Sequence, residues 1–207
     1  MPLVPLLPLL VLAGGESRRM GVDKATLAWE GTPLLLRVID RLAPITAEVW
    51  VAARPGQTLP AGAYRRVDDE RPGEGPLAGL SRGLAAIAGV WDATPVAVAA
   101  CDYPHADPAL FPALLAASPD AAAIVPLLDG RAHPLLAVWR SDLAAACERA
   151  LARGARRVRE VLDEVGAVEV DARRLLGDAA DRALLNVNDP ATLKKAIGRS
   201  EQDPAPG

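Results

Sequence analysis

Short apolar runs alternate along this chain with stretches of helical periodicity. Two of the runs, Leu9–Leu12 and Val96–Ala100, contain no polar residue at all. A strand of this kind has no polar face to turn toward water, so both of its sides must be covered, as in the interior of a parallel sheet. The sequence therefore predicts an α/β fold, with a mostly parallel sheet and helices on both of its faces.

The predicted strands share short length and a high content of Val, Leu and Ala. They are Leu9–Leu12, Val49–Ala52, Tyr64–Val67, Val96–Ala100, Ala122–Val125, Leu135–Trp139 and Val168–Val170. Two of them flank Asp129-Gly130, a dipeptide typical of tight turns. A local antiparallel excursion is therefore expected between Ala122 and Trp139.

Helical patterns lie between the strands, and several begin at a capping residue or a proline. They run from Thr32-Pro33 to about Leu42, from Leu77 to Ala88, from an Asp107 cap with Pro108 in the first turn, from a Ser141 cap to Gly154, over Arg156–Val165, and from an Asp189 cap with Pro190. The alternation predicts one doubly wound, three-layer domain over residues 1–207. Its core covers about 9–197, and the polar stretch 200–207 is expected to be a flexible tail.

Charge and cysteine content argue against several classes of function. A net charge of −3 gives no electrostatic basis for binding nucleic acid. The two cysteines, Cys101 and Cys147, form no CxxC or Cys/His pattern typical of zinc. The apolar stretch 2–13 contains three prolines, lacks a basic segment before it and is too short to span a membrane. A cytoplasmic protein without a membrane segment is the expectation.

The segment from Leu12 to Lys24 carries the strongest functional signal. It reads LAGGESRRMGVDK and directly follows a predicted buried strand. Gly14 and Gly15 permit a sharp turn and a close approach of the backbone to a ligand. Backbone N–H groups in such a loop can hold phosphate oxygens, and loops at the carboxyl ends of strands are where open α/β sheets bind ligands.

Cationic residues in the same segment strengthen the phosphate-binding interpretation. Arg19 and Lys24 supply forked and point-charge donors, and Lys24 is the only lysine among the first 193 residues. The spacing does not fit a Walker loop, which needs four residues between its glycines, because five residues separate Gly15 from Gly21. It does not fit the dinucleotide-binding fingerprint either, because no GxGxxG triad is present. The sequence predicts a phosphate-binding loop of another kind.

With four later motifs, this segment resembles the molybdenum cofactor guanylyltransferases, the MobA family within the pterin and sugar-nucleotide nucleotidyltransferases. The later motifs are Gly75–Leu80 (GPLAGL), Cys101–Pro104 (CDYP), Asp129-Gly130 with His133-Pro134, and Asn186–Pro190 (NVNDP). The resemblance extends from about Leu9 to Ile197. It implies transfer of GMP from GTP to the phosphate of molybdopterin or the molybdenum cofactor, with formation of the guanine dinucleotide and release of pyrophosphate.

The resemblance also implies a role for individual residues. Catalytic roles would fall on Arg19, Lys24 and Asp102, and Asp102 would hold Mg²⁺, which prefers one or two carboxylates together with substrate phosphates. The nucleotide-binding residues would be Leu12, Ala13, Gly14, Gly15, Lys24, Asp69, Gly79 and Asp102. The acceptor-binding residues would be His133, Asn186 and Asn188. A turn or cap is the structural alternative for Asp102, Asn186 and Asn188, and a solvated loop is the alternative for Asp69.

One departure from the family leaves the recognition of the base open. Family members often carry an asparagine just after the second strand, but this chain reads Val51-Ala52-Ala53-Arg54. A molybdopterin cytidylyltransferase, or another nucleotidyltransferase with a small acceptor, is the nearest alternative. A nucleotide-binding or cofactor-chaperone module without turnover is the alternative from another class. GTP and molybdopterin are the expected partners, with molybdoenzymes or cofactor-delivery proteins as further candidates.

Overall fold

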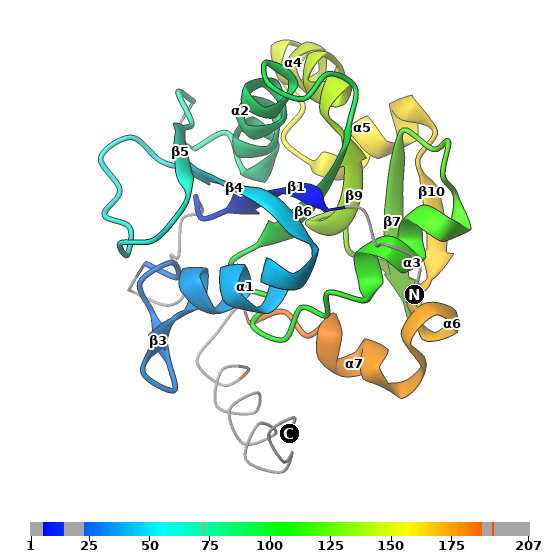
Figure 1. The fold of residues 1–207 in the computed structure, drawn as a ribbon. Coiled ribbons are helices and arrows are strands. Elements are labelled where there is room, and N and C mark those ends of the chain that lie inside the picture. Colours follow the sequence, from blue (N-terminus) through cyan, green and yellow to red (C-terminus); the bar gives the residue numbers. More distant parts are fainter. Residues whose placement is uncertain (1–5, 15–22, 72, 188–191, 193–207) are drawn as a thin grey trace.

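One eight-stranded sheet runs through the computed structural model, which describes residues 6–14, 23–71, 73–187 and 192 (Figure 1). Its strands are β1 (Leu7–Leu12), β4 (Thr46–Ala53), β5 (Arg65–Asp68), β6 (Pro95–Ala100), β7 (Ala123–Leu128), β8 (Arg131–Ala132), β9 (Leu136–Arg140) and β10 (Val168–Asp171). A separate two-stranded sheet pairs β2 (Ala28–Trp29) with β3 (Thr32–Pro33). All seven predicted strands are present.

The strand order is β10-β7-β9-β6-β1-β4-β5, with β8 beside β7. Strands β5, β4, β1 and β6 are parallel to one another, and β9 lies between β6 and β7 and is antiparallel to both. The prediction of a mostly parallel sheet with an antiparallel excursion is thus confirmed. Strand β4 lies beside one edge of β1, and β6 lies beside the other edge. The order of the strands therefore reverses between β1 and β6. Ligands bind at such a switch point in open α/β sheets.

The principal helices are α1 (Leu34–Leu42), α2 (Pro76–Ala88), α3 (Leu110–Ala117), α4 (Ala144–Ala152) and α5 (Val158–Val165). Two short helices, α6 (Ala172–Leu176) and α7 (Ala180–Ala183), follow β10 and were not predicted. Helices α2 and α4 lie over one face of the sheet, and α1 and α3 lie over the other (Figure 1). The predicted layer arrangement is therefore confirmed.

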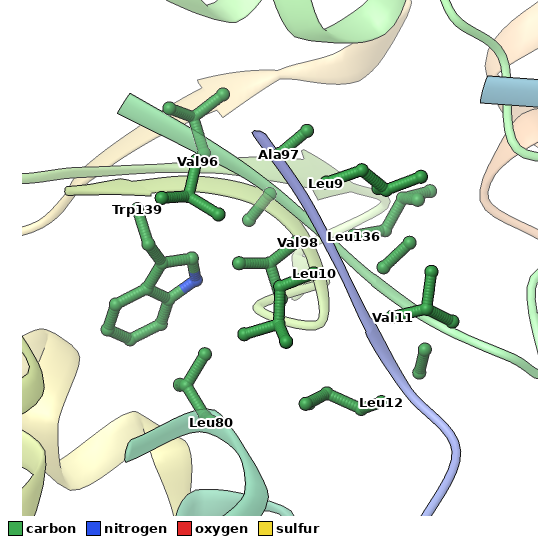
Figure 2. Packing of buried hydrophobic residues seen from close by; sticks show 14 of the residues in the cluster. Leu9, Leu10, Val11, Leu12, Leu80, Val96, Ala97, Val98, Leu136 and Trp139 are labelled. Atoms are coloured by element: carbon green, nitrogen blue, oxygen red, sulfur yellow. The ribbon is translucent and has the colours of Figure 1, made fainter. Parts of the chain in front are cut away.

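The core is densest where β1 and β6 run through the middle of the sheet. Leu9, Leu10 and Val11 have no exposed surface, which is why an apolar side chain stands at every position of this strand. Figure 2 shows Leu10 and Leu12 of β1 on the same side as Leu80 of α2. This packing fixes the carboxyl ends of β1 and β6, from which the loops of the candidate site emerge.

Three predicted helix starts differ in detail from the structure. Thr32-Pro33 form β3, so Pro33 precedes α1 instead of occupying its first turn. Ser141 does not cap a helix, because its Oγ accepts from the N–H of Thr94 at 3.1 Å and donates to the carbonyl of Trp91 at 3.0 Å. Its buried hydroxyl thus fastens the end of β9 to the turn before β6, and α4 begins after a 3₁₀ turn, Ser141–Leu143.

The helix after Asp107 also begins later than its cap suggests. The Asp107 carboxylate accepts from the N–H of Ala109 at 2.9 Å, but that bond closes a turn, and α3 starts at Leu110. The helix expected from Asp189 and Pro190 lies outside the described residues.

Within the described ranges, no helix combines the length and the apolar character needed to cross a membrane.

Candidate functional site

A cavity of about 300 Å³ opens at the carboxyl ends of β1 and β6. Its walls come from the β1 loop, the loop after β4, the segment between β5 and α2, and the end of β6. They are formed by Leu12, Ala13, Gly14, Lys24, Arg54, Asp69, Gly73, Gly75, Pro76, Ala100, Cys101, Asp102 and Leu135. The structure therefore brings together six of the residues predicted from sequence: Leu12, Ala13, Gly14, Lys24, Asp69 and Asp102.

The first turn of the β1 loop is fastened to β4. The N–H groups of Ala13 and Gly14 both donate to the carbonyl of Ala52, at 2.9 and 3.2 Å. Both N–H groups thus hold the start of the loop against β4. Gly14 lines the cavity, and a Cβ there would lie 3.6 Å from the backbone nitrogen of Arg54, which is an ordinary contact distance. Gly15 and Arg19 lie outside the described residues.

Lys24 and Asp102 form an ion pair inside the cavity. Lys24 Nζ lies 3.3 Å from Asp102 Oδ2, and the two side chains are only 17% and 16% exposed. Burial raises the pKa of Asp102, while the Lys24 ammonium and the side chain of Asn186 oppose that rise. A carboxylate this deep depends on nearby cationic and hydrogen-bonding groups to remain ionised.

The second carboxylate oxygen of Asp102, Oδ1, receives no hydrogen bond from the described residues. This oxygen is buried. The described residues contain no group of three or more His, Cys, Asp or Glu side chains that could hold a metal by themselves. One carboxylate oxygen in a phosphate-sized cavity fits the donor set of Mg²⁺, which takes its remaining ligands from water and substrate phosphates.

Asp69 adds a second carboxylate to the cavity wall. It is 7% exposed, whereas its neighbours Asp68 and Glu70 are exposed, so the alternative of a solvated loop does not hold for this residue. The N–H of Asp69 donates to the carbonyl of Ala53 at 2.7 Å, and its Oδ1 accepts from the N–H of Arg71 at 2.9 Å. These two bonds turn the chain inward at the end of β5.

The glycine-rich motif before α2 contributes residues other than the one expected. Gly73, Gly75 and Pro76 line the cavity. Gly79 lies one turn further along α2, where a Cβ would be 3.7 Å from Ala52 Cβ and from Leu12 Cδ2. The structure thus places Gly79 behind the cavity wall, at the contact between α2 and the sheet.

Two of the residues assigned to the acceptor, Asn186 and His133, lie near Asp102 and its neighbour Tyr103. The side chain of Asn186 lies close enough to Asp102 to lower the pKa of its carboxyl, and the next residue, Val187, donates its N–H to the carbonyl of Asp102 at 2.8 Å. His133 is buried, and its Nδ1 lies 3.1 Å from the hydroxyl of Tyr103. Neither Asn186 nor His133 lines the cavity itself. Asn188 lies outside the described residues.

Burial decides the protonation of this polar group. The pKa of His133 is lowered to about 4, first by burial and then by the Arg131 cation, so the imidazole is neutral near pH 7. The pKa of Tyr103 is raised to about 12 by burial and by the charge of Asp102. Tyr103 therefore keeps its hydroxyl proton and can donate it to a neutral imidazole, consistent with a positioning role for His133.

Sequence reasoning missed two side chains of the cavity that carry a titratable group, Arg54 and Cys101. Arg54 had been noted only for the amide that its segment lacks, yet it forms the wall there, and its Nη2 lies 3.0 Å from Asp23 Oδ2. Cys101 precedes Asp102, and burial raises the pKa of its thiol strongly, so it stays neutral and is no nucleophile. Arg54 could have been found from its place directly after a parallel strand, but Cys101 carried no separate signal.

Comparisons with known proteins point to one family. The family model for the MobA-like NTP transferase domain matches residues 9–169. A protein of Mycobacterium avium named probable molybdenum cofactor guanylyltransferase is 41% identical over 189 residues, covering 89% of this chain and 92% of the relative. A protein of Mycobacterium tuberculosis with the same name is 41% identical over 190 residues, covering 89% of this chain and 90% of the relative.

Solved structures share the fold at lower identity. Molybdopterin-guanine dinucleotide biosynthesis protein A from Archaeoglobus fulgidus superposes with a TM-score of 0.76 at 23% identity, covering 95% of this chain and all of the other. A 2-C-methyl-D-erythritol 4-phosphate cytidylyltransferase from Thermus thermophilus gives a TM-score of 0.70 at 21% identity, covering 95% and 99%. The family model and the close relatives together establish that this chain belongs to the MobA-like NTP transferase family.

Proposed function

We propose that this protein transfers GMP from GTP to the terminal phosphate of molybdopterin, or of its molybdenum-loaded form, and releases pyrophosphate. The observation that carries the proposal is the Lys24–Asp102 pair, which stands in a cavity at the switch point of the sheet. The guanylyl donor is favoured by relatives that are 41% identical over most of the chain and are named guanylyltransferases.

The reaction requires positioning and charge neutralisation more than proton transfer. An oxygen of the acceptor phosphate attacks the α-phosphorus of GTP, and the bond to the bridging oxygen breaks, so that pyrophosphate leaves with that electron pair. Lys24 would neutralise the triphosphate and the departing pyrophosphate, and Arg19 is proposed to assist it. No proton needs to move, because the attacking oxygen is already anionic.

Asp102 is proposed as the protein ligand of a catalytic Mg²⁺. Its buried Oδ1, which has no partner among the residues that the structure describes, supports this role. When bound, the ion would supply positive charge to the phosphate oxygens as negative charge develops on the leaving group. Asp23, the carboxylate next to Lys24 in the sequence, is a poorer candidate, because its oxygens already accept from Arg54, Gln57 and Ala25.

The acceptor is proposed to enter from the side of Asp102 where Asn186 and His133 lie, with Asn188 contributing as well. Asn186 is beside Asp102, and His133 reaches the same region through Tyr103. The same proposal includes a cytoplasmic location and delivery of the product to a molybdoenzyme or a cofactor-delivery protein.

Pyrophosphate release tests this proposal. The purified protein is supplied with GTP, CTP or ATP and Mg²⁺, with and without molybdopterin. We expect release with GTP that depends on the acceptor. A clear preference for CTP, measured as kcat/KM, would assign the chain to the cytidylyl alternative. Nucleotide binding without release of pyrophosphate under any of these conditions would indicate the non-catalytic alternative.

A further inference from the structure

The side-chain amide of Gln57 lies buried beneath the β1 loop. The residue is 7% exposed, and every polar atom of its amide has a partner. Nε2 donates to the carbonyl of Ala13 at 3.0 Å and lies 3.0 and 2.9 Å from the two carboxylate oxygens of Asp23. Oε1 accepts from the N–H of Arg54 at 2.9 Å. One amide therefore closes its own turn at Arg54 and joins that turn to Ala13 and Asp23, which lie 44 and 34 positions earlier in the sequence.

Two of those segments are the two ends of one loop. The chain leaves β1 at Ala13 and returns at Asp23, and the next residue is Lys24. Asp23 is held further by Arg54 Nη2 at 3.0 Å and by the N–H of Ala25 at 3.0 Å. The position of the Lys24 backbone thus depends on how firmly Asp23 is held.

We infer that Gln57 is a positioning residue, which clamps the exit and the return of the 13–23 loop and thereby holds Lys24 against Asp102. Gln57 does not line the cavity, so it acts through Lys24 and not by touching substrate. The inference deepens the proposed function, because it concerns the residue assigned to the triphosphate. It also explains why Asp23 does not compete with Asp102 for the Lys24 ammonium.

The chemistry of the clamp requires a primary amide. The carbonyl of Ala13 and the carboxylate of Asp23 can only accept hydrogen bonds, so the group between them must donate two. The N–H of Arg54 needs an acceptor at the same place. Glutamine supplies both kinds of group, whereas a glutamate of the same shape would direct an acceptor toward two acceptors and add a like charge beside Asp23.

Gln57→Glu is therefore the sharpest test, with Gln202→Glu, the same change at the other glutamine of the chain, as its matched control. The first measurement is the rate at which an amine-acylating reagent modifies Lys24 in the absence of nucleotide, determined by mass spectrometry with Lys194 and Lys195 as internal references. The second is the affinity for Mg²⁺-GTP at about pH 8 and about pH 5, a range that spans titration of a carboxyl group whose pKa a neighbouring carboxylate raises.

We expect Gln57→Glu to accelerate acylation of Lys24 and to weaken nucleotide affinity roughly tenfold at the higher pH. Part of the affinity should return at the lower pH, where the introduced carboxyl is protonated and can donate one bond. Gln57→Met, which is uncharged and has no donor, should give the same loss without the recovery at low pH. Melting temperatures of all variants identify any general loss of fold, which would not show this pH dependence.

Two results would overturn the inference. Unchanged acylation of Lys24 with weakened nucleotide affinity would mean that Gln57 acts on the ligand and not on Lys24. Faster acylation with unchanged affinity would mean that Gln57 holds Lys24 in place but that this placement does not contribute to nucleotide binding. If the unaltered protein binds none of the nucleoside triphosphates, the proposed function fails, and the acylation rates alone still decide whether Gln57 holds Lys24.

Discussion

Lys24 Nζ and Asp102 Oδ2 lie 3.3 Å apart, although 78 residues separate them in the sequence. Lys24 follows the loop that leaves β1, and Asp102 follows β6, the parallel neighbour of β1. The pairing therefore exists because these two strands end side by side. It places a cation in the same cavity as a carboxylate whose second oxygen has no partner among the described residues, an arrangement that suits the proposed binding of a triphosphate and a divalent cation.

Asp102→Asn should leave the protein folded and reduce turnover by at least about 10²-fold, the scale seen when a placed electrostatic group is lost. The amide keeps the size of the side chain but removes the anionic ligand, so the dependence on Mg²⁺ should weaken. Thermal melting and pyrophosphate release against Mg²⁺ concentration are measured together. The exposed Asp92 provides the control, Asp92→Asn, which should change neither. Near-normal turnover in Asp102→Asn would remove Asp102 from the metal site.

Lys24→Ala should lose far more activity than Arg18→Ala, because Lys24 is the cation placed at Asp102. The variant should also respond differently to pH. Lys24 lowers the pKa of Asp102, so its removal raises that pKa, and the fall of activity on the acid side should move to higher pH. The pH profile of kcat/KM checks this shift. Equal losses in both variants would mean that the loop supplies only diffuse positive charge.

The buried imidazole of His133 should make stability depend on pH. Its pKa is about 4 in the folded protein, below the ordinary 6.5, so the unfolded chain binds the proton first as pH falls. The stabilisation is therefore complete above about pH 6.5 and is lost as the pH falls toward 4. His133→Asn, which keeps an acceptor for Tyr103, should flatten this part of the curve of Tm against pH. An unchanged slope in the variant would assign the effect to other groups.

Gly83→Ala should destabilise the protein by about 1–3 kcal/mol, since it overpacks the contact between α2 and β1. A Cβ at Gly83 would lie 2.4 Å from Leu10 Cδ1, and Leu10 is fully buried. Gly89→Ala, at the end of the same helix, would meet nothing closer than 3.5 Å and serves as the control. Denaturant unfolding compares the two. Equal stability would mean that Leu10 can repack without cost.

Donor choice provides a further prediction, because the segment Val51–Arg54 lacks the asparagine common in the family. We expect GTP to be used in preference to CTP and ATP, with Arg54, the next residue after Ala52-Ala53, in the wall of the cavity. Competition binding of the three Mg²⁺-nucleotides measures this without the acceptor. Equal affinities would place the discrimination, if any, in the transfer step.

The sequence by itself determined the layer structure and the order of the site motifs. Continuous apolarity at Leu9–Leu12 and Val96–Ala100 marks strands that must be covered on both faces, and that property depends on local composition alone. Asp129-Gly130 marked the antiparallel excursion for the same reason, since turn chemistry is local. Once β1 and β6 are known to be interior parallel strands, the nearness of their following loops is expected as well.

Only the tertiary structure decided how the polar groups are used. The N–H groups of Ala13 and Gly14 are taken by Ala52, the Ser141 hydroxyl by the turn before β6, and Asp23 by Gln57 and Arg54. Each of these bonds joins residues that are at least 31 positions apart in the sequence, so no local pattern encodes it. A buried polar group takes whichever complementary partner the packing brings within about 3 Å, because leaving it unpaired is costly. Because packing brings Asp102 within reach of Lys24 and engages Asp23 with Gln57 and Arg54, Lys24 pairs with Asp102 and not with the adjacent Asp23.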